Sequence, residues 1–315
     1  MAHVSTGRLP PPEVVQSWLE EAHARFAGNR DGELSRVYPA LERAPADALG
    51  IAVAATTGQV FTVGDAGDEF TIMSVSKPFV FALVCERIGP DAIRDRVGVN
   101  STGLPFNSIE AVERSLDGRT NPMVNSGAIA TTSLAPDWDF SRAGLTRFAG
   151  RALGFDDEVY ASASATNSRN QAIARLLDLD RDPADAVDLY TRQCSLRVSA
   201  RDLAVMGATL ADGGVNPVTG ERVIEAEVCH YTLAVMLTAG LYEDSGSWLY
   251  DVGLPAKSGI GGGIVTISPG KGGMGTYAPR LDAAGNSVKG SLVARHLSQQ
   301  RGLDLLISSA FIPAG

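Results

Sequence analysis

The sequence has few cysteines and histidines. The three cysteines are too few and too widely spaced for a disulfide framework, and no pair has the spacing of metal ligands. They are Cys85, Cys194 and Cys229. The four histidines fall in no recognisable catalytic triad or metal-binding pattern. They are His3, His23, His230 and His296. These shortages argue against a disulfide-stapled domain, a metal site and a Ser-His-Asp hydrolase, and they fit a reducing cytoplasm.

Long hydrophobic runs and basic tracts are also lacking. The longest uninterrupted apolar run, Phe79 to Cys85, is far too short to span a bilayer, and the N-terminus lacks the apolar stretch of a signal peptide. The chain has 36 acidic and 27 basic residues, a formal net charge of −9, and no run of lysines or arginines that would follow a phosphate backbone. We therefore expect a cytoplasmic protein with no membrane segment and no nucleic-acid partner.

What is present suffices for a substantial core, because 44% of the 315 residues are hydrophobic. Apolar residues recur at helical spacing over residues 14–26, which predicts an amphipathic helix. Residues 50–63 contain two short strand-like stretches around a Gly turn and predict a β-hairpin. From about residue 100 to 240 the pattern is mostly helical, clearest at 169–177 and 200–210.

The C-terminal part returns to strands. Residues 264–267 and 275–277 are β-like, residues 288–299 are helical, and residues 303–311 predict a last strand. Strands at both ends with helices between them predict one α/β (α+β) domain, 1–315, whose sheet is completed by both termini. We expect the sheet lobe at about 27–75 and 250–315, and a helical lobe inserted at about 76–249.

The segment from Phe70 to Cys85 carries the most informative motif. Lys77 is the only charged residue between Glu69 and Glu86, so the helix is apolar all round and is expected to be buried. Pro78 is tolerated in the first turn, which places Ser74 at the helix N-terminus and Lys77 one turn later. This is the S-x-x-K arrangement of serine acyl-transfer enzymes, with Ser74 as nucleophile and a desolvated Lys77 as base. A helix-capping serine beside a snorkelling lysine is the simpler alternative.

A second motif lies at residues 253–264. Its Lys257-Ser258-Gly259 is similar to the K-T-G strand that faces the nucleophile in penicillin-binding proteins and β-lactamases. The glycines do not have P-loop spacing, so an edge strand lying against the substrate is the better interpretation. In that arrangement the backbone N–H groups of Ser74 and Ile260 form the oxyanion hole.

From about Gly32 to Phe311 the sequence closely resembles the serine-dependent glutaminases. The stretches that carry the resemblance are Ser74-Val-Ser-Lys77, Gly103 to Ser108, Asn121 to Ala130, Arg169-Asn170, Tyr190 to Ser195, Asp212 to Pro217, Gly253 to Gly263 and Leu281 to Ser287. The resemblance implies a β-lactamase-like fold, a homo-oligomer and hydrolysis of glutamine to glutamate and ammonia through an acyl-enzyme on Ser74, with no cofactor and no metal.

The resemblance also assigns roles to individual residues. The catalytic group is Ser74, Lys77, Tyr190 and Lys257, and the substrate-binding group is Asn125, Asn170, Tyr190, Tyr242 and Ile260. Tyr190 is expected to pass a proton to the departing ammonia, because a phenol near two lysines can have a lowered pKa. Without the resemblance, these tyrosines and asparagines would be assigned only structural hydrogen bonds.

Three positions depart from the family pattern. Met73 stands where the family has glutamine, and Ala163 stands where it has glutamate. Val37 stands where it has tyrosine, unless Tyr38 substitutes by a local shift. In the family these groups hold the amino-acid end of glutamine. An amidase or esterase of the same fold with another substrate, and a non-catalytic binding protein, are therefore the alternatives to a glutaminase, although a binding protein has no need of a costly buried lysine.

Overall fold

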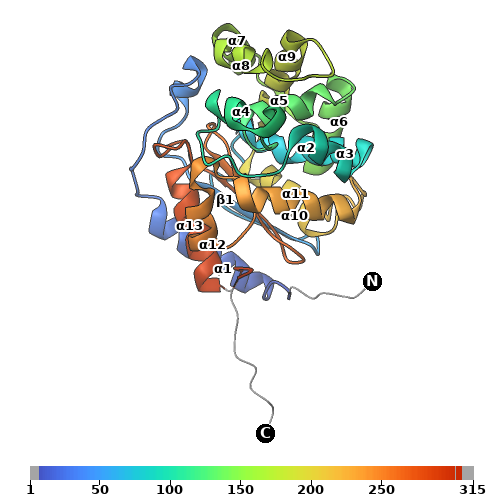
Figure 1. The fold of residues 1–315 in the computed structure, drawn as a ribbon. Coiled ribbons are helices and arrows are strands. Elements are labelled where there is room, and N and C mark those ends of the chain that lie inside the picture. The colour runs from blue at the N-terminus through green and yellow to red at the C-terminus, as the bar shows by residue number, and fades with distance from the viewer. Residues whose placement is uncertain (1–6, 302, 307–315) are drawn as a thin grey trace.

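The fold is seen in a computed structural model that describes residues 7–301 and 303–306 (Figure 1). His3 and residues 307–311 of the predicted last strand lie outside these residues. The four described residues from Leu303 to Leu306 form a turn and no strand.

The centre of the molecule is a five-stranded antiparallel sheet in the order β2-β1-β8-β7-β6. Its strands are β1 (Gly50–Ala55), β2 (Val60–Gly64), β6 (Ala256–Ser258), β7 (Gly263–Ser268) and β8 (Gly272–Tyr277). The hairpin β1–β2 pairs Val53 with Phe61, and β1 pairs on its other side with β8, where Val53 lies opposite Met274. The predicted hairpin and the predicted sheet, built from both ends of the chain, are confirmed.

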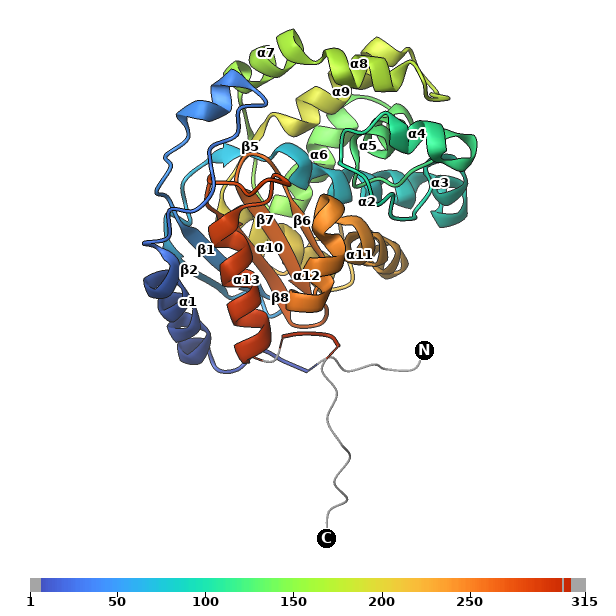
Figure 2. The same ribbon diagram turned by 60° about the vertical axis from the view of Figure 1, so that its left-hand side comes forward.

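One face of the sheet is covered by helices from both ends of the chain (Figure 2). These are α1 (Pro12–Phe26), α12 (Ser245–Val252) and α13 (Val288–Arg301). Helix α1 buries Val15, Leu19 and Ala22, which recur at a helical spacing of three to four residues. The helices predicted at 14–26 and 288–299 are confirmed.

Helix α10 (Ala200–Ala211) packs on the opposite face, against β8, β1 and β7. It lies unusually close to β8 because Gly273 and Gly275 have no side chains. A Cβ atom at Gly273 would collide with the carbonyl oxygen of Ala204, and one at Gly275 with that of Ala200. The helix predicted at 200–210 is therefore present, but it covers the sheet, whereas the sequence analysis assigned it to a separate helical lobe.

The remaining helices form a region beside the sheet. They are α2 (Ser76–Ile88), α3 (Pro90–Val97), α4 (Glu110–Arg114), α5 (Asn125–Ser133), α6 (Trp138–Ala149), α7 (Asp157–Thr166), α8 (Ser168–Ala174), α9 (Pro183–Cys194) and α11 (Ala226–Ala239). The segment that follows α1 runs from the sheet to this region, where the short 3-10 helix η1 (Pro39–Arg43) packs on α7 (Figure 2). The division into two lobes stays a prediction.

A second, three-stranded sheet, which the sequence analysis did not predict, joins the two regions. Its order is β3-β5-β4, from β3 (Phe70–Thr71), β5 (Leu196–Val198) and β4 (Gly154–Phe155). The Thr71 hydroxyl donates a hydrogen bond of 3.0 Å to Asp156, whose carboxylate also caps α7 through Val159 N and lies 3.7 Å from the Arg197 guanidinium. Strand β3 leads directly into Ser74, so this sheet fixes the approach to the nucleophile.

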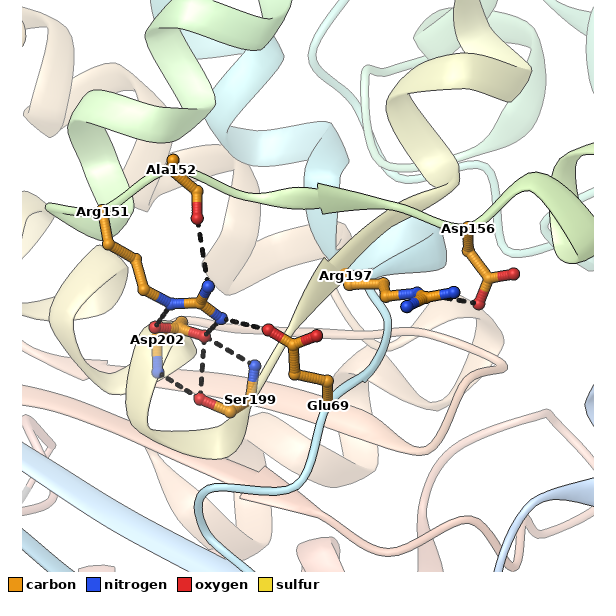
Figure 3. Close-up of polar contacts among 7 residues, drawn as sticks. All are labelled: Glu69, Arg151, Ala152, Asp156, Arg197, Ser199 and Asp202. Atoms are coloured by element: carbon orange, nitrogen blue, oxygen red, sulfur yellow. Dashed lines mark hydrogen bonds and ion pairs between the residues drawn. The ribbon is translucent and has the colours of Figure 1, made fainter.

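An ion-pair cluster lies beside this small sheet (Figure 3). The Asp202 side chain is 1% exposed; its two oxygens accept from Arg151 Nε at 2.8 Å and Nη2 at 2.6 Å. It also accepts from the backbone and hydroxyl of Ser199, forming the capping box that begins α10. Arg151 reaches Glu69 as well, at 2.9 Å. The cluster ties the start of α10 to the end of α6 and to the segment before β3.

Candidate active site

Ser74 lies in a tight 3-10 turn, η2 (Met73–Val75), directly before the fully buried first part of α2. Pro78 falls in the first turn of α2, as predicted. Met73 has a φ of 47°, a left-handed conformation that is costly for a residue other than glycine. Gly259 packs against this turn; a Cβ atom there would lie 3.2 Å from Ser74 N. The turn places Ser74, which is 7% exposed, opposite the edge strand β6.

Lys77 is one turn beyond Ser74 and is 3% exposed. Its Nζ donates to Asn125 Oδ1 at 2.8 Å and to Met123 O at 3.3 Å. Burial lowers the pKa of Lys77 to about 7, against a smaller opposing effect from Cys194. A neutral amine has two N–H groups and one lone pair. Since the two oxygens take the N–H groups, the lone pair is left to accept a proton.

Lys257 lies on β6 and is fully buried. Its Nζ donates to Ser258 O at 2.7 Å and lies 4.0 Å from the centre of the Tyr242 ring. Burial, followed by the charge of Lys77, holds the pKa of Lys257 well below its usual value. The Tyr242 hydroxyl donates to Ser258 O at 3.2 Å, and Tyr242 has a φ of 59°. Strained backbone thus flanks the site on both sides, and the predicted edge strand is confirmed.

A chain of amide side chains runs from Lys77 across the helices. Asn125 Oδ1 accepts from Lys77 and from the Tyr190 hydroxyl, the latter at 3.2 Å. Asn125 Nδ2 donates to Asn170 Oδ1 at 2.9 Å, Asn170 donates to Asn167 at 2.6 Å, and Asn167 donates to Thr191 at 2.8 Å. The sequence analysis missed Asn167 and Thr191. Asn167 stands three residues before Asn170, at the N-cap of α8, and this spacing was an available signal, whereas Thr191, next to Tyr190, gave none.

The expected lowered pKa of Tyr190 is wrong. Burial, and then the nearby Cys194 thiol, raise the pKa of Tyr190 well above its usual value. The ring centre lies 5.8 Å from Lys77 Nζ, but the two buried lysines have lowered pKa values themselves and offer little positive charge to stabilise a phenolate. Tyr190 is therefore a protonated phenol that donates a hydrogen bond to Asn125.

A pocket of about 140 Å³ opens at Ser74. Five predicted site residues line it: Ser74, Asn125, Asn170, Tyr190 and Ile260. The other three, Lys77, Lys257 and Tyr242, are not among the residues that line it; Phe106, which does line the pocket, packs on the Tyr242 ring at 4.7 Å between centres. The three departing positions, Val37, Met73 and Ala163, line the same pocket, and so does Tyr38.

Larger hollows, of about 250, 630 and 790 Å³, lie elsewhere on the surface and contain none of the predicted site residues. In the described part of the chain, no group of three or more His, Cys, Asp or Glu side chains is placed to hold a metal ion. Within residues 7–301 and 303–306, no helix has both the length and the apolar character needed to cross a membrane.

Comparison with known proteins agrees with this geometry. The family model described as Glutaminase matches residues 32–306. The chain is 63% identical to Glutaminase 2 of Yersinia pestis, over 98% of this chain and 94% of that protein. It is 44% identical to the glutaminase of Colwellia psychrerythraea, over 93% of this chain and 97% of that protein.

Solved structures give the same result. The structure of the probable glutaminase ybaS has a TM-score of 0.93 and 39% identity and covers 95% of this chain and 100% of its own. Mglu in its glutamate form has a TM-score of 0.88 and 36% identity, over 96% of this chain and 72% of its own. An antiparallel sheet with helices on its faces and a Ser-x-x-Lys helix beside its edge strand defines a β-lactamase-like protein. Within that class, the chain belongs to the glutaminase family.

Proposed function

We propose that this protein hydrolyses the side-chain amide of L-glutamine to L-glutamate and ammonia through an acyl-enzyme on Ser74. The observation that carries the proposal is the buried pair Lys77 and Lys257, one on each side of the Ser74 turn, with lowered pKa values. Burying a lysine without a carboxylate partner destabilises the fold. Such a lysine beside a serine is suited to accept the proton of the serine hydroxyl.

In the proposed first step, Lys77 Nζ takes the proton of the Ser74 hydroxyl while Oγ adds to the amide carbon. The backbone N–H groups of Ser74 and Ile260 hold the oxygen that gains negative charge. Lys77 then returns the proton to the amide nitrogen, the C–N bond breaks, and ammonia leaves an ester on Ser74. Water adds to this ester with Lys77 again taking the proton, and glutamate departs as Ser74 regains its own.

The other site residues have supporting roles in this proposal. Asn125 orients Lys77, and Tyr190 holds Asn125 as a protonated donor. Asn170 extends the same hydrogen-bond chain, so a substrate that reaches Asn170 is aligned with Lys77. Lys257 and Tyr242 both donate to Ser258 O on the edge strand, and the charge that forms on Lys77 disfavours protonation of Lys257.

A glutamine-like affinity label tests the nucleophile, because a stable adduct identifies the attacking atom. We expect mass spectrometry to find one adduct on the peptide that contains Ser74, and neither adduct nor ammonia release in Ser74→Ala. The matched control is Ser76→Ala; Ser76 is also buried, but its hydroxyl donates to Met73 O. An adduct on Cys194, or one that persists in Ser74→Ala, contradicts the assignment.

We also propose a cytoplasmic location and a homo-oligomer. The buried free thiols of Cys85, Cys194 and Cys229 support a reducing compartment. The family resemblance supports the assembly. Light scattering of the purified protein at micromolar concentration gives the mass, and a monomer contradicts the second proposal.

A further inference from the structure

Four buried side chains connect helix α9 to the base of the active site. They are Asn125, Asn170, Asn167 and Thr191, and each is hydrogen-bonded to the next. They come from three helices: Asn125 begins α5, Asn170 lies on α8 with Asn167 at its N-cap, and Thr191 lies on α9. The proposed mechanism uses Asn125 and Asn170 and leaves the other two without a role.

The direction of this hydrogen-bond chain is fixed at its far end. Each asparagine has a donating end and an accepting end, so the amides alone allow either direction. A neutral Lys77 amine and the Tyr190 hydroxyl can each donate and accept, so they do not fix it either. On α9, however, the Thr191 hydroxyl donates to Val187 O at 2.7 Å, and a backbone carbonyl can only accept.

The direction then passes along the chain one bond at a time. Since the Thr191 hydrogen points to the backbone carbonyl, its oxygen accepts from Asn167 Nδ2 at 2.8 Å. Asn167 Oδ1 therefore faces Asn170 Nδ2, at 2.6 Å, and Asn170 Oδ1 faces Asn125 Nδ2, at 2.9 Å. The oxygen of Asn125 is left to face Lys77 Nζ, at 2.8 Å.

This direction decides whether the lone pair of Lys77 is free. Met123 O and Asn125 Oδ1 accept the two N–H groups of the neutral amine, which leaves its lone pair for the proton of Ser74. In a reversed chain, the Asn125 amide would point an N–H group at Lys77 and occupy that lone pair.

We propose that Asn167 and Thr191 are positioning residues that hold the Asn125 amide with its oxygen toward Lys77. The proposal rests on the proposed function, because it takes Lys77 as the base in glutamine hydrolysis. A protonated Lys77 enforces the same direction by itself, since an ammonium group has three donors and no acceptor. The two positioning residues therefore act on the reaction only while Lys77 is neutral.

Thr191→Val tests the proposal, because it removes the hydroxyl and keeps the shape of the side chain. With the fixed end lost, the reversed chain competes whenever Lys77 is neutral. At about pH 8.5, kcat/KM for ammonia release from L-glutamine should fall about threefold or more, whereas at about pH 5.5 it should match wild type. Thr191→Ser, which keeps the hydroxyl, should restore the wild-type rate at the higher pH.

Thr132→Val is the matched control. Thr132 is also buried, but its hydroxyl donates to Gln193 Oε1 at 2.9 Å, and Gln193 donates to Ser141, in a separate chain of hydrogen bonds. This variant should match wild type at both pH values.

Other titratable groups face Lys77, but they are common to all these proteins. Cys194 and Tyr190 on α9 have raised pKa values, and Lys257 on β6 has a lowered one. The substitutions remove no hydrogen bond of these three side chains. A difference between the pH profiles therefore reports on the chain that ends at Thr191.

A loss of equal size at both pH values overturns the proposal, because a structural defect or a lost contact with substrate lowers the rate whatever the charge of Lys77. No loss at either pH overturns it too, as does the same profile in Thr132→Val. If circular dichroism shows that Thr191→Val does not fold, Asn167→Ala breaks the same chain and should give the same profile. The proposed function fails in a different way: the wild-type protein then releases no ammonia from glutamine, or release continues in Ser74→Ala.

Discussion

The half-buried cation Arg151 and the buried lysines Lys77 and Lys257 have opposite kinds of partner. At the Arg151 cluster, the guanidinium donates hydrogen bonds to Asp202 and Glu69, and these bonds raise the pKa of Arg151. Burial alone would raise the pKa of Asp202, but hydrogen bonds from Arg151 and Ser199 outweigh it and the pKa is lowered. At the site, Lys77 and Lys257 face amide and carbonyl oxygens and have lowered pKa values.

The comparison shows how the partner of a cationic side chain affects its role: carboxylate partners favour a structural role, and neutral oxygen partners allow acid–base chemistry. A guanidinium keeps its proton in proteins, and the carboxylate partners of Arg151 stabilise that form further, so Arg151 holds three segments together and has no acid–base chemistry. A neutral oxygen orients a lysine without fixing its proton, so Lys77 stays near the point where it can give or take one. Three predictions test this contrast.

The largest effect is expected from Lys77→Met, which removes the amine and keeps a similar volume. Ammonia release should fall by about a thousandfold, as for loss of a general base. Stability should rise, because the variant no longer buries a group that prefers to be charged.

The stability gain should depend on pH. Because the pKa of Lys77 is about 7 when folded and 10.5 in its unperturbed form, the unfolded chain binds more protons between these values. The cost of burying Lys77 is therefore full below about pH 7 and shrinks as the pH rises toward 10.5. Thermal unfolding of the wild-type protein and of Lys77→Met, from about pH 7 to 10.5, measures how this cost changes. A variant that is less stable than wild type at pH 7 would show that Lys77 is a structural residue.

The next effect is expected from Asp202→Asn, which leaves the Arg151 guanidinium without its main partner. We expect a loss of about 2 kcal/mol in the free energy of unfolding, below the range for a fully buried pair because the Arg151 side chain is 37% exposed. Turnover by the folded variant should stay within a few-fold of wild type. Urea denaturation measures the loss.

Glu69→Gln is the matched control, because the Glu69 side chain is 41% exposed and is the second partner of the same guanidinium. It should cost less than about 1 kcal/mol. Equal losses in the free energy of unfolding for the two variants would contradict the prediction that the buried carboxylate contributes more to stability than the exposed one.

The last test leaves the sequence unchanged and varies only the pH of the assay. Protonated Lys77 has no lone pair, so kcat/KM should rise about tenfold per unit as the pH rises toward about 7, and then level off. Asp202 in the Arg151 cluster, whose pKa is lowered, should add no step to this profile. Initial rates in buffers of constant ionic strength give the profile. A rate that is flat from about pH 5.5 to 8.5 would exclude Lys77 as a base with this pKa.

Local patterns were sufficient to predict much of the site. The apolar stretch around Lys77 predicted a buried helix, and the glycine-rich segment after Lys257 predicted an edge strand, because burial and strand pairing follow from short-range periodicity. The pocket lining by Asn125, Asn170 and Ile260 followed from the resemblance to a family.

What failed depends on contacts between distant segments. The direction of the Tyr190 pKa depends on the protonation of two lysines that the fold brings near it, which spacing along the chain does not give. The pairing of Phe70 with Val198 joins two-residue and three-residue strands that are too short to leave a periodic signal. The position of α10 depends on glycines in β8, more than 60 residues away in the sequence.

That contact between α10 and β8 limits how the sequence can diverge. At Gly273 and Gly275, any side chain would push the helix from the sheet, and the start of α10 carries Asp202, so the ion-pair cluster would move with it. Even alanine at either position would collide with backbone atoms of α10. A smaller neighbouring side chain could not relieve that collision, so the backbone itself would have to move. Val37 and Ala163 line the pocket and lie outside this junction, so the same restriction does not apply to them.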